Sequence, residues 1–355
     1  MARGQRRRRS GPGRWVLIGV VVVAVIAAAG AVFVLRNGDD DNKSATASIR
    51  NDLDTVYAPY VYMTLADRPA LTEIAAKTGA NALHLAFAIT EGDTCSLAWD
   101  GTTALDTYKD EITAAIDKGL EVIVSSGGAS GGEVAEACED ADATQEQLQK
   151  LIDLGVRYID FDVEGDERVA NSTANEARAQ AIAALQEKNP DLKVSFTLAA
   201  APPTDAKTAP GAAATAPWVA AVDAGVVIDR INLMTMNFGG DVAPLDMGAA
   251  ATAAATGLHA QIETIQGIES ADAWAMVGIT PMIGVNDLNA EKFSLDNAKT
   301  VTEFAAKNGV GMLSFWSVGR DARCGADVTK QPVANCSGVE QSEYAFSSIF
   351  KAVLQ

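Results

Sequence analysis

Histidine and cysteine, the residues that bind most zinc ions in proteins, are scarce in this sequence. The 355 residues include two His and four Cys, and no two Cys have the Cys-x-x-Cys spacing. Zinc sites usually draw their ligands from such short, regular spacings. We therefore expect no zinc site in this chain, and we predict that the protein uses no cofactor.

Basic residues are also few: 28 Lys and Arg face 46 Asp and Glu, which gives a formal net charge of -18. Six of the basic residues are Arg within residues 1–14, a segment without an acid. The remainder is more acidic still, with 22 basic residues (28 minus 6) against 46 acidic ones. Such a surface repels nucleic acid and suits a neutral or cationic ligand, so we expect no nucleic-acid partner.

Charge is absent from residues 15–35, and this apolar run matches the roughly 20 residues that cross a bilayer. Arg-rich residues 1–14 precede it and acidic residues 39–41 follow it, which orients the N-terminus to the cytoplasm. We predict a basic cytoplasmic tail, a single transmembrane helix over 15–35, and an extracellular remainder anchored in the cell membrane. A cleaved signal peptide is the alternative, although its apolar core is usually only about 7–15 residues. The remainder would then be secreted.

Polar residues 36–54 are typical of a stalk, and no repeated sequence follows them. From residue 55 to 355, strand-like runs alternate with helix-like segments. The predicted strands are Tyr57–Met63, Ala82–Ile89, Glu121–Ser126, Tyr158–Val163, Lys193–Leu198, Arg230–Met236, Ala275–Ile279 and Gly311–Phe315. The predicted helices are Ala70–Lys77, Leu105–Lys118, Gln145–Asp153, Ala174–Lys188, Pro217–Ala224, Ala249–Ile265, Leu295–Lys307 and Glu343–Val353.

Eight such units predict an α/β fold of the closed (β/α)8 type, the TIM barrel. An open doubly wound sheet is the alternative, but the glycine-rich turn that binds dinucleotides is missing from the sequence. In a barrel, the active residues lie where the parallel strands end.

One of these strands, within Tyr158–Gly165, has apolar residues that alternate with three acids, Asp160, Asp162 and Glu164. A period of two places the acids on one face, roughly 6.5 Å apart. Carboxyls this close inside a buried strand cannot all ionise, so at least one should keep its proton near neutral pH. A protonated carboxyl beside an ionised one is what cleavage of a glycosidic bond requires.

Two other interpretations of these acids remain open. They could line the solvent face of a half-exposed strand, or they could bind a divalent metal. The apolar flanking residues favour a buried strand, and the Gly and Glu spacing of a calcium loop is absent.

The four Cys are even in number and lie in the part predicted to be outside the cell, where disulfides persist. We favour the pairs Cys95–Cys138 and Cys324–Cys336, each of which would join neighbouring loops. A crossed pairing is the alternative.

Five motifs at predicted strand ends resemble one known family. They are Ser125-Ser126-Gly127-Gly128; Asp160, Asp162 and Glu164, with Arg157 where the family has a first Asp; Met234-Thr235-Met236-Asn237-Phe238-Gly239; Thr280–Asp287; and Ser314–Ser317 with Arg320-Asp321. Roughly residues 55–350 resemble the family 18 glycoside hydrolases, in particular the secreted bacterial chitinases. In that family the acid motif is Asp-x-x-Asp-x-Asp-x-Glu, and the sixth strand usually reads Met-Thr-Met-Asp-Tyr-Gly.

The resemblance implies substrate-assisted hydrolysis, in which the acetamide of the sugar is the nucleophile. Glu164 would protonate the leaving oxygen and later activate water. Asp162 would bind the acetamide N–H, and Asp160 would share a proton with Asp162. Trp316 would form the apolar floor beneath the sugar.

The remaining candidates for substrate binding are Asn237, Met234, Ser125, Gly127, Gly128 and Tyr62. We expect Ser125, Gly127 and Gly128 to shape the lumen, and we favour a core position for Met234 and Met236. Asn237 and Phe238 replace the Asp and Tyr of the family. Asn still forms hydrogen bonds, whereas Phe does not.

These features predict an enzyme that cleaves β-1,4 links between N-acetylglucosamine units, with chitin or a related oligosaccharide as substrate. Two alternatives stay open: a weakened or inactive chitin-binding protein tethered to the surface, and an endo-β-N-acetylglucosaminidase acting on glycoprotein glycans. We expect a monomer whose membrane contact is the N-terminal helix.

Overall fold

The computed structural model describes residues 54–203, 211–239, 246–288, 291–325 and 333–355. The predicted tail, transmembrane helix and nearly all of the stalk lie outside the described residues, so their boundaries stay predictions. Among the described residues, no helix has the length and apolar composition that a membrane span needs.

The described residues form one large sheet, in the strand order β1-β12-β9-β8-β7-β6-β5-β3-β2. All neighbours in this order are parallel, and β4 pairs antiparallel with β3. The bounds are β1 Val56–Tyr57, β2 Tyr60–Tyr62, β3 Ala82–Thr90, β4 Leu97–Trp99, β5 Glu121–Gly127, β6 Tyr158–Asp162, β7 Lys193–Ala199, β8 Arg230–Met234, β9 Val277–Thr280 and β12 Met312–Leu313. A separate antiparallel pair consists of β10 (Gly284–Val285) and β11 (Lys292–Phe293).

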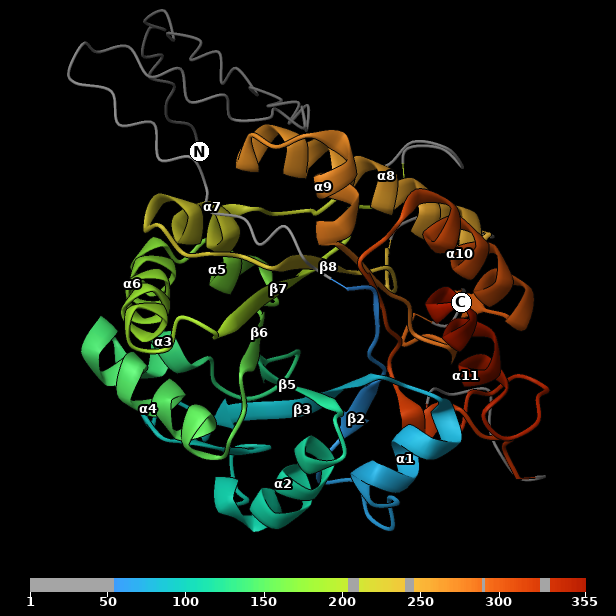
Figure 1. Ribbon diagram of the computed structural model, residues 1–355, viewed down its shortest axis with the longest axis horizontal. Helices are drawn as coiled ribbons and strands as arrows, with labels where there is room; N and C mark the ends of the chain where they lie inside the picture. The colour runs from blue at the N-terminus through green and yellow to red at the C-terminus, as the bar shows by residue number, and fades with distance from the viewer. Residues whose placement is uncertain (1–53, 204–210, 240–245, 289–290, 326–332) are drawn as a thin grey trace, which may run out of the picture. The chain divides into compact units, whose positions relative to one another are not determined.

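The two ends of the strand order, β1 and β2, are separated in the chain only by Ala58 and Pro59. The predicted strand Tyr57–Met63 is therefore two short strands, because Pro59 has no N–H to donate and interrupts the ladder. The first half pairs with β12 and the second with β3. The sheet thus curls into a TIM-barrel-like ring, with the helices outside it (Figure 1).

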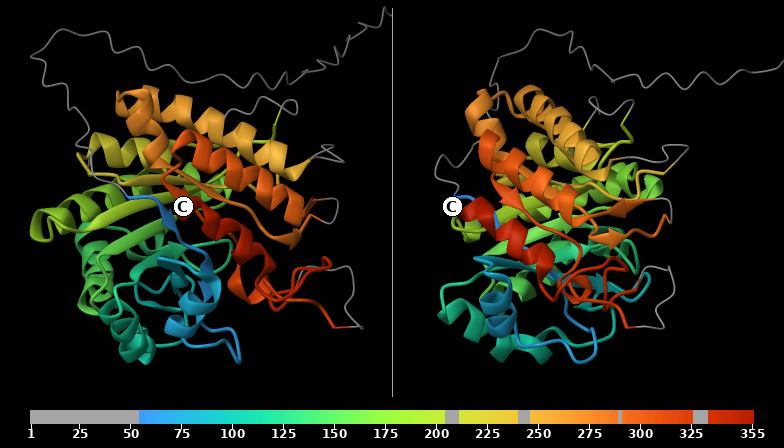
Figure 2. Two further views of the ribbon diagram at one scale, coloured as in Figure 1. Left: turned by 45° about the vertical axis from the view of Figure 1, so that its right-hand side comes forward. Right: turned by 90° about the vertical axis from the view of Figure 1, so that its right-hand side faces the viewer.

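Helices follow most strands and cover the outer face of the sheet (Figure 1). Their bounds are α1 Leu71–Thr78, α2 Lys109–Asp117, α3 Val134–Cys138, α4 Ala141–Asp153, α5 Asp166–Val169, α6 Ser172–Lys188, α7 Ala216–Asp223, α8 Met247–Gln266, α9 Ser270–Met276, α10 Leu295–Asn308 and α11 Ala345–Phe350, with 3-10 turns at Leu105–Tyr108, Val318–Arg320 and Lys351–Leu354. Side-chain caps begin several of them; Ser294 and Asn297, for example, form a capping box on α10. The C-terminal α11 packs beside α10 (Figure 2).

The core lies between the sheet and the helices. On β6, Ile159 and Phe161 point into it and are fully buried, and the Phe161 ring packs against Phe196 of β7 at 5.6 Å between centroids. The strand period then directs Asp160 and Asp162 to the opposite face, the inside of the ring. The alternation predicted for this strand is therefore confirmed.

The predicted strand Ala275–Ile279 is wrong at its start. Ala275 and Met276 complete α9, and the strand begins only at Val277. Ala273 and Met276 are both buried on the inner side of α9. A helical turn brings these two residues to one face, whereas a strand would place them on opposite faces and expose one of them.

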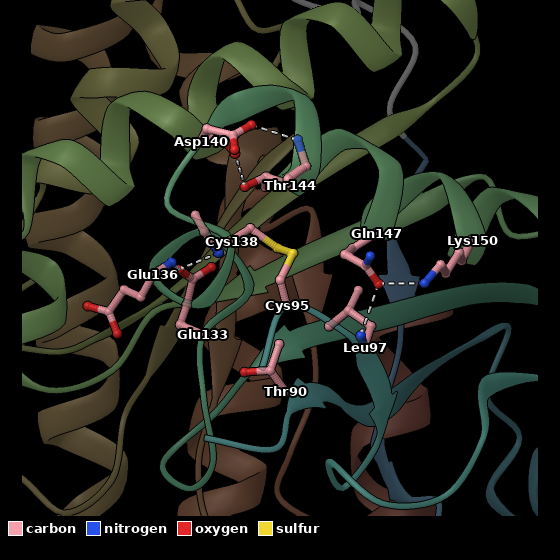
Figure 3. Close-up of a disulfide and its surroundings, with 12 residues drawn as sticks. Thr90, Cys95, Leu97, Glu133, Glu136, Cys138, Asp140, Thr144, Gln147 and Lys150 are labelled. Carbon is pink, nitrogen blue, oxygen red and sulfur yellow. Dashed lines mark hydrogen bonds between the residues drawn. A yellow bond between two sulfur atoms is a disulfide. The ribbon is translucent and has the colours of Figure 1, made fainter. Parts of the chain in front are cut away.

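Both favoured disulfides are present, Cys95–Cys138 and Cys324–Cys336. The first joins the loop before β4 to the last residue of α3, a helix that also carries Glu136 (Figure 3). It therefore fixes α3 against the loop that follows β3.

Candidate active site

A cavity of about 400 Å³ opens where the parallel strands end. Its lining combines aromatic rings, acids, methionines and small residues, namely Tyr60, Tyr62, Phe87, Asp100, Ala129, Ser130, Asp162, Glu164, Ala199, Met234, Met236, Asn237, Thr280, Met282, Asp287 and Trp316. Apolar rings beside a few acids suit a ligand with one apolar face and many hydroxyls.

Asp160 lies beneath this cavity, fully buried and saturated with hydroxyl donors. Ser195 Oγ donates to it at 2.6 Å, Ser125 Oγ at 2.8 Å and Thr197 Oγ1 at 2.9 Å. Tyr60 adds a longer contact of 3.4 Å. No hydrogen bond joins Asp160 to Asp162 in the described part of the chain, so the proton sharing between them stays a prediction.

Asp162 is also buried, but one of its carboxylate oxygens has no hydrogen-bond partner among the described residues. Burial raises the pKa of Asp162 well above its usual range, and the nearby Glu164 and Asp160 carboxyls raise it further. Asp162 is also one of the residues that line the cavity.

Glu164 follows β6 directly, at the open end of the strand. Burial raises its pKa from 4.5 to about 7; the Arg168 charge lowers the pKa and Asp287 raises it. A carboxyl that is half protonated near neutral pH can both donate and accept a proton. Asp162 and Glu164 thus meet the expectation of at least one protonated carboxyl.

Trp316 forms one wall of the cavity together with Phe87, whose ring is stacked on it at 5.4 Å between centroids. The rings of Tyr60 and Tyr62 lie 5.9 and 6.1 Å from Trp316. The peptide bonds Ala86–Phe87 and Trp316–Ser317 are both cis. Together these rings offer an apolar platform of the kind on which a sugar ring stacks.

Asn237 joins two loops at the rim of the cavity. Its Nδ2 donates to Asp287 at 3.0 Å, and its Oδ1 accepts from the Leu288 N–H at 3.2 Å. Phe238 turns the other way: it is buried in the core and does not line the cavity.

No family model matches the chain. Over 315 residues it is 31% identical to the "Probable bifunctional chitinase/lysozyme" of Escherichia coli (strain K12), a match that covers 83% of this chain and 34% of that protein. Over 285 residues it is 32% identical to "Endochitinase 11" of Metarhizium anisopliae, covering 75% of this chain and 52% of that one. The chain thus spans about a third to a half of the length of these relatives.

Among solved structures, the catalytic domain of a hyperthermophilic chitinase from Pyrococcus furiosus superposes with a TM-score of 0.74 at 29% identity, covering 87% of this chain and 97% of that one. A fern chitinase of glycoside hydrolase family 18 has the same fold, with a TM-score of 0.55 at 13% identity. The chain belongs to the family 18 glycoside hydrolases. The resemblance that its motifs predict is therefore confirmed.

The predicted residues of this family 18 site divide into two groups. Glu164, Asp162, Trp316, Asn237, Met234 and Tyr62 line the cavity, whereas Asp160, Ser125, Gly127 and Gly128 do not. Ser125 instead binds Asp160, and the backbone N–H of Gly128 donates to the Asp162 carbonyl at 2.9 Å. Ser125 and Gly128 thus contact the two Asp residues of β6, and the role of all three Ser and Gly residues in shaping the lumen stays a prediction.

Met234 and Met236, for which we favoured a core position, both line the cavity, although Met234 is also buried. Apolar residues near the end of a strand look alike in sequence whether they face the core or the lumen. The strand ends at Met234, and the irregular chain beyond it places Met236 at the cavity as well.

Several lining residues escaped the sequence analysis. Phe87 and Asp100 carry no motif of their own, and Asp100 matters because Tyr62 and Thr64 both donate hydrogen bonds to its carboxylate. Asp287 lies at the end of a quoted motif and was given no role. Its position two residues after β10, at the end of that motif, was the signal that could have identified it.

Proposed function

We propose that this chain hydrolyses β-1,4 links between N-acetylglucosamine units by a retaining, substrate-assisted mechanism. The observation that carries the proposal is the pair formed by Asp162, buried with an unsatisfied oxygen, and Glu164, whose pKa is raised to about 7. Membership of a family whose relatives bear the names chitinase and endochitinase supports chitin as the substrate.

In the first step, the acetamide oxygen of the sugar forms a bond to the anomeric carbon while the glycosidic bond breaks. Glu164 gives its proton to the leaving oxygen. In the second step, Glu164 takes a proton from water, and the water oxygen bonds to the anomeric carbon from the face that the first leaving group occupied. The bond between the anomeric carbon and the acetamide oxygen breaks at the same time, which restores the acetamide. Two inversions restore the starting configuration.

Asp162 would accept the acetamide N–H through its unsatisfied oxygen and would stabilise the cationic oxazolinium intermediate. Asp160 supports it from below and is itself held by the hydroxyls of Ser125, Ser195 and Thr197. Trp316 would shield the acetamide from water by stacking against the sugar.

The test is hydrolysis of soluble chito-oligosaccharides by the purified protein, with glucose oligomers of equal length as control. We expect cleavage of the N-acetylated substrates alone, because the nucleophile belongs to them. NMR of the fresh product should show the β-anomer. Cleavage of both substrates, or an α-anomer, would contradict the mechanism.

A sugar-binding protein without activity is the second candidate, motivated by Asn237 in place of the family's Asp. Binding of chito-oligosaccharides without turnover at any pH from 4 to 9 would establish it and exclude the enzyme. Action on glycoprotein glycans is a third possibility, and release of glycans from a high-mannose glycoprotein would reveal it.

We also propose that the protein is a closed (β/α)8 barrel acting as a monomer outside the cell, tethered by residues 15–35. The Arg-rich front and the uncharged run support the tether. Full-length protein in the soluble cytoplasm would exclude it, and a mature N-terminus near residue 30 would replace the anchor with a signal peptide.

A further inference from the structure

Arg168 on α5 reaches across to the loop that follows β5. Its guanidinium donates to the Gly128 carbonyl at 3.4 Å and to the Gly131 carbonyl at 2.5 Å. Its Nε lies 3.4 Å from a carboxylate oxygen of Glu136 on α3. One side chain thus connects three segments that are separate in the sequence.

The loop that Arg168 holds is a wall of the cavity. Ala129 and Ser130, the two residues between the bonded carbonyls, are exposed and line the cavity. At one end the loop is tied to β6, because the Gly128 N–H donates to the Asp162 carbonyl. At the other end, Gly132 and Thr90 exchange two backbone hydrogen bonds. Between these ties, the hydrogen bonds from Arg168 to the Gly128 and Gly131 carbonyls flank Ala129 and Ser130 on both sides.

Arg168 also interacts electrostatically with Glu164, four residues earlier in the chain. The other charged residues that line the cavity are acids: Asp162 on β6, Asp287 after β10 and Asp100 after β4. Among these described groups the guanidinium is the cation that opposes them.

We infer that Arg168 is a positioning residue of the reaction, which holds the Ala129–Ser130 wall over the substrate and keeps a positive charge beside Glu164. The inference rests on the proposed function, since it assigns Arg168 to the same cavity. The position of Arg168 is itself secured from α3, where Glu136 also accepts a hydrogen bond from Asn171 Nδ2 at 3.2 Å. The disulfide at Cys138 fixes the end of that helix (Figure 3).

Two substitutions separate the two roles. Arg168→Gln removes the charge, so the pKa of Glu164 should rise, and the alkaline midpoint of kcat/KM should move up by as much as about 1 pH unit. Arg168→Lys keeps the charge but cannot reach both carbonyls with one ammonium. Its midpoint should stay in place while KM for chito-oligosaccharides rises roughly fivefold, as expected for one lost hydrogen bond.

A third variant tests the electrostatic role of Arg168 independently, in case the Arg168→Gln protein misfolds. Glu136→Gln removes the carboxylate that partly neutralises the guanidinium, so the midpoint should move down, opposite to Arg168→Gln. The matched control is Arg157→Gln. Arg157 lies just before the N-terminal end of β6, half of its side chain is exposed, and it forms an ion pair with Asp191 at 3.5 Å. Arg157→Gln changes the net charge by the same amount, so the midpoint and KM should both stay unchanged.

All measurements use the full chain, with thermal unfolding to verify folding. An unmoved midpoint in folded Arg168→Gln and in Glu136→Gln would overturn the inference, as would an unchanged KM in Arg168→Lys. Equal shifts in Arg157→Gln would also overturn it. A wild-type protein that binds but does not cleave chito-oligosaccharides would refute the proposed function instead. In that case, the dissociation constants of the same variants for chito-oligosaccharides would test whether Arg168 holds the Ala129–Ser130 wall.

Discussion

Replacing Glu164 by Gln keeps the size of the side chain and removes its transferable proton. Because general acid catalysis typically contributes about 10²- to 10⁴-fold, kcat on chito-oligosaccharides should fall by at least the lower of these factors. Binding should survive, since Trp316 and the other rings are untouched. In the wild type, kcat/KM should fall as the pH rises through about 7, where Glu164 loses its proton.

The same substitution should change stability in a way that depends on pH. The pKa of Glu164 is about 7 in the folded protein against an ordinary value of 4.5. Below pH 4.5 both states are protonated. As the pH rises to 7 the unfolded state loses its proton first, so wild-type stability falls across that window. A difference of about 2.5 between the pKa values corresponds to about 3 kcal/mol at most, since Glu164 is partly exposed.

Glu164→Gln should therefore be more stable than the wild type at pH 8 by up to about 3 kcal/mol, and equally stable below pH 4.5. Denaturant unfolding at pH 4 and pH 8 measures this difference. The control is Glu167→Gln, an exposed acid on α5, which should show no such pH dependence. A stability difference that is the same at both pH values would refute the reasoning, as would undiminished hydrolysis by Glu164→Gln.

Three further substitutions test the cavity and the backbone beside it. Asp287→Asn removes a charge that raises the pKa of Glu164, so the alkaline midpoint of kcat/KM should move down; an upward shift would contradict this. Gly127→Ala would place a Cβ 2.0 Å from the Asp162 carbonyl oxygen, and it should cost several kcal/mol of stability. Gly165→Ala, with a positive φ of 89° but open space, should cost only about 1–2 kcal/mol, as denaturant unfolding would show.

The sequence predicted the fold well wherever a strand has a clear period. The alternation in β6 assigns each side chain to the lumen or the core, and the structure agrees. The prediction from the sequence failed where long-range packing determines the secondary structure. Ala275 and Met276 suit a strand by local pattern, but the end of α9 buries Met276. The split of the first strand depends on its two different neighbours, which no local pattern contains.

The site was predictable where its residues are adjacent in sequence. Asp160, Asp162 and Glu164 share one strand, so their face and order follow from a period of two. Phe87 and Asp100 reach the cavity from β3 and the turn after β4, and neither carries a signal beyond its residue type. The contact between Arg168 and the Gly128–Gly131 loop carries no such signal either, because it depends on the direction that α5 takes after Gly165.

The register of the sheet explains why Asp160 and Asp162 differ although they share a strand and a face. Asp160 lies in register with Ser125 on one side and Ser195 on the other, and both hydroxyls donate to it. Asp162 lies in register with Gly127 and Thr197.

Gly127 has no side chain to offer Asp162, and the Thr197 hydroxyl is turned down to Asp160. One carboxyl is therefore satisfied within the protein. The other has an oxygen without a partner among the residues that the structure describes, and its pKa is raised. A difference of this kind in hydrogen bonding and pKa gives neighbouring acids separate roles, one structural and one in ligand binding. Gly127 therefore matters to Asp162 in two ways. Its bare backbone admits the Asp162 carbonyl, and it brings no side-chain donor to the Asp162 carboxylate.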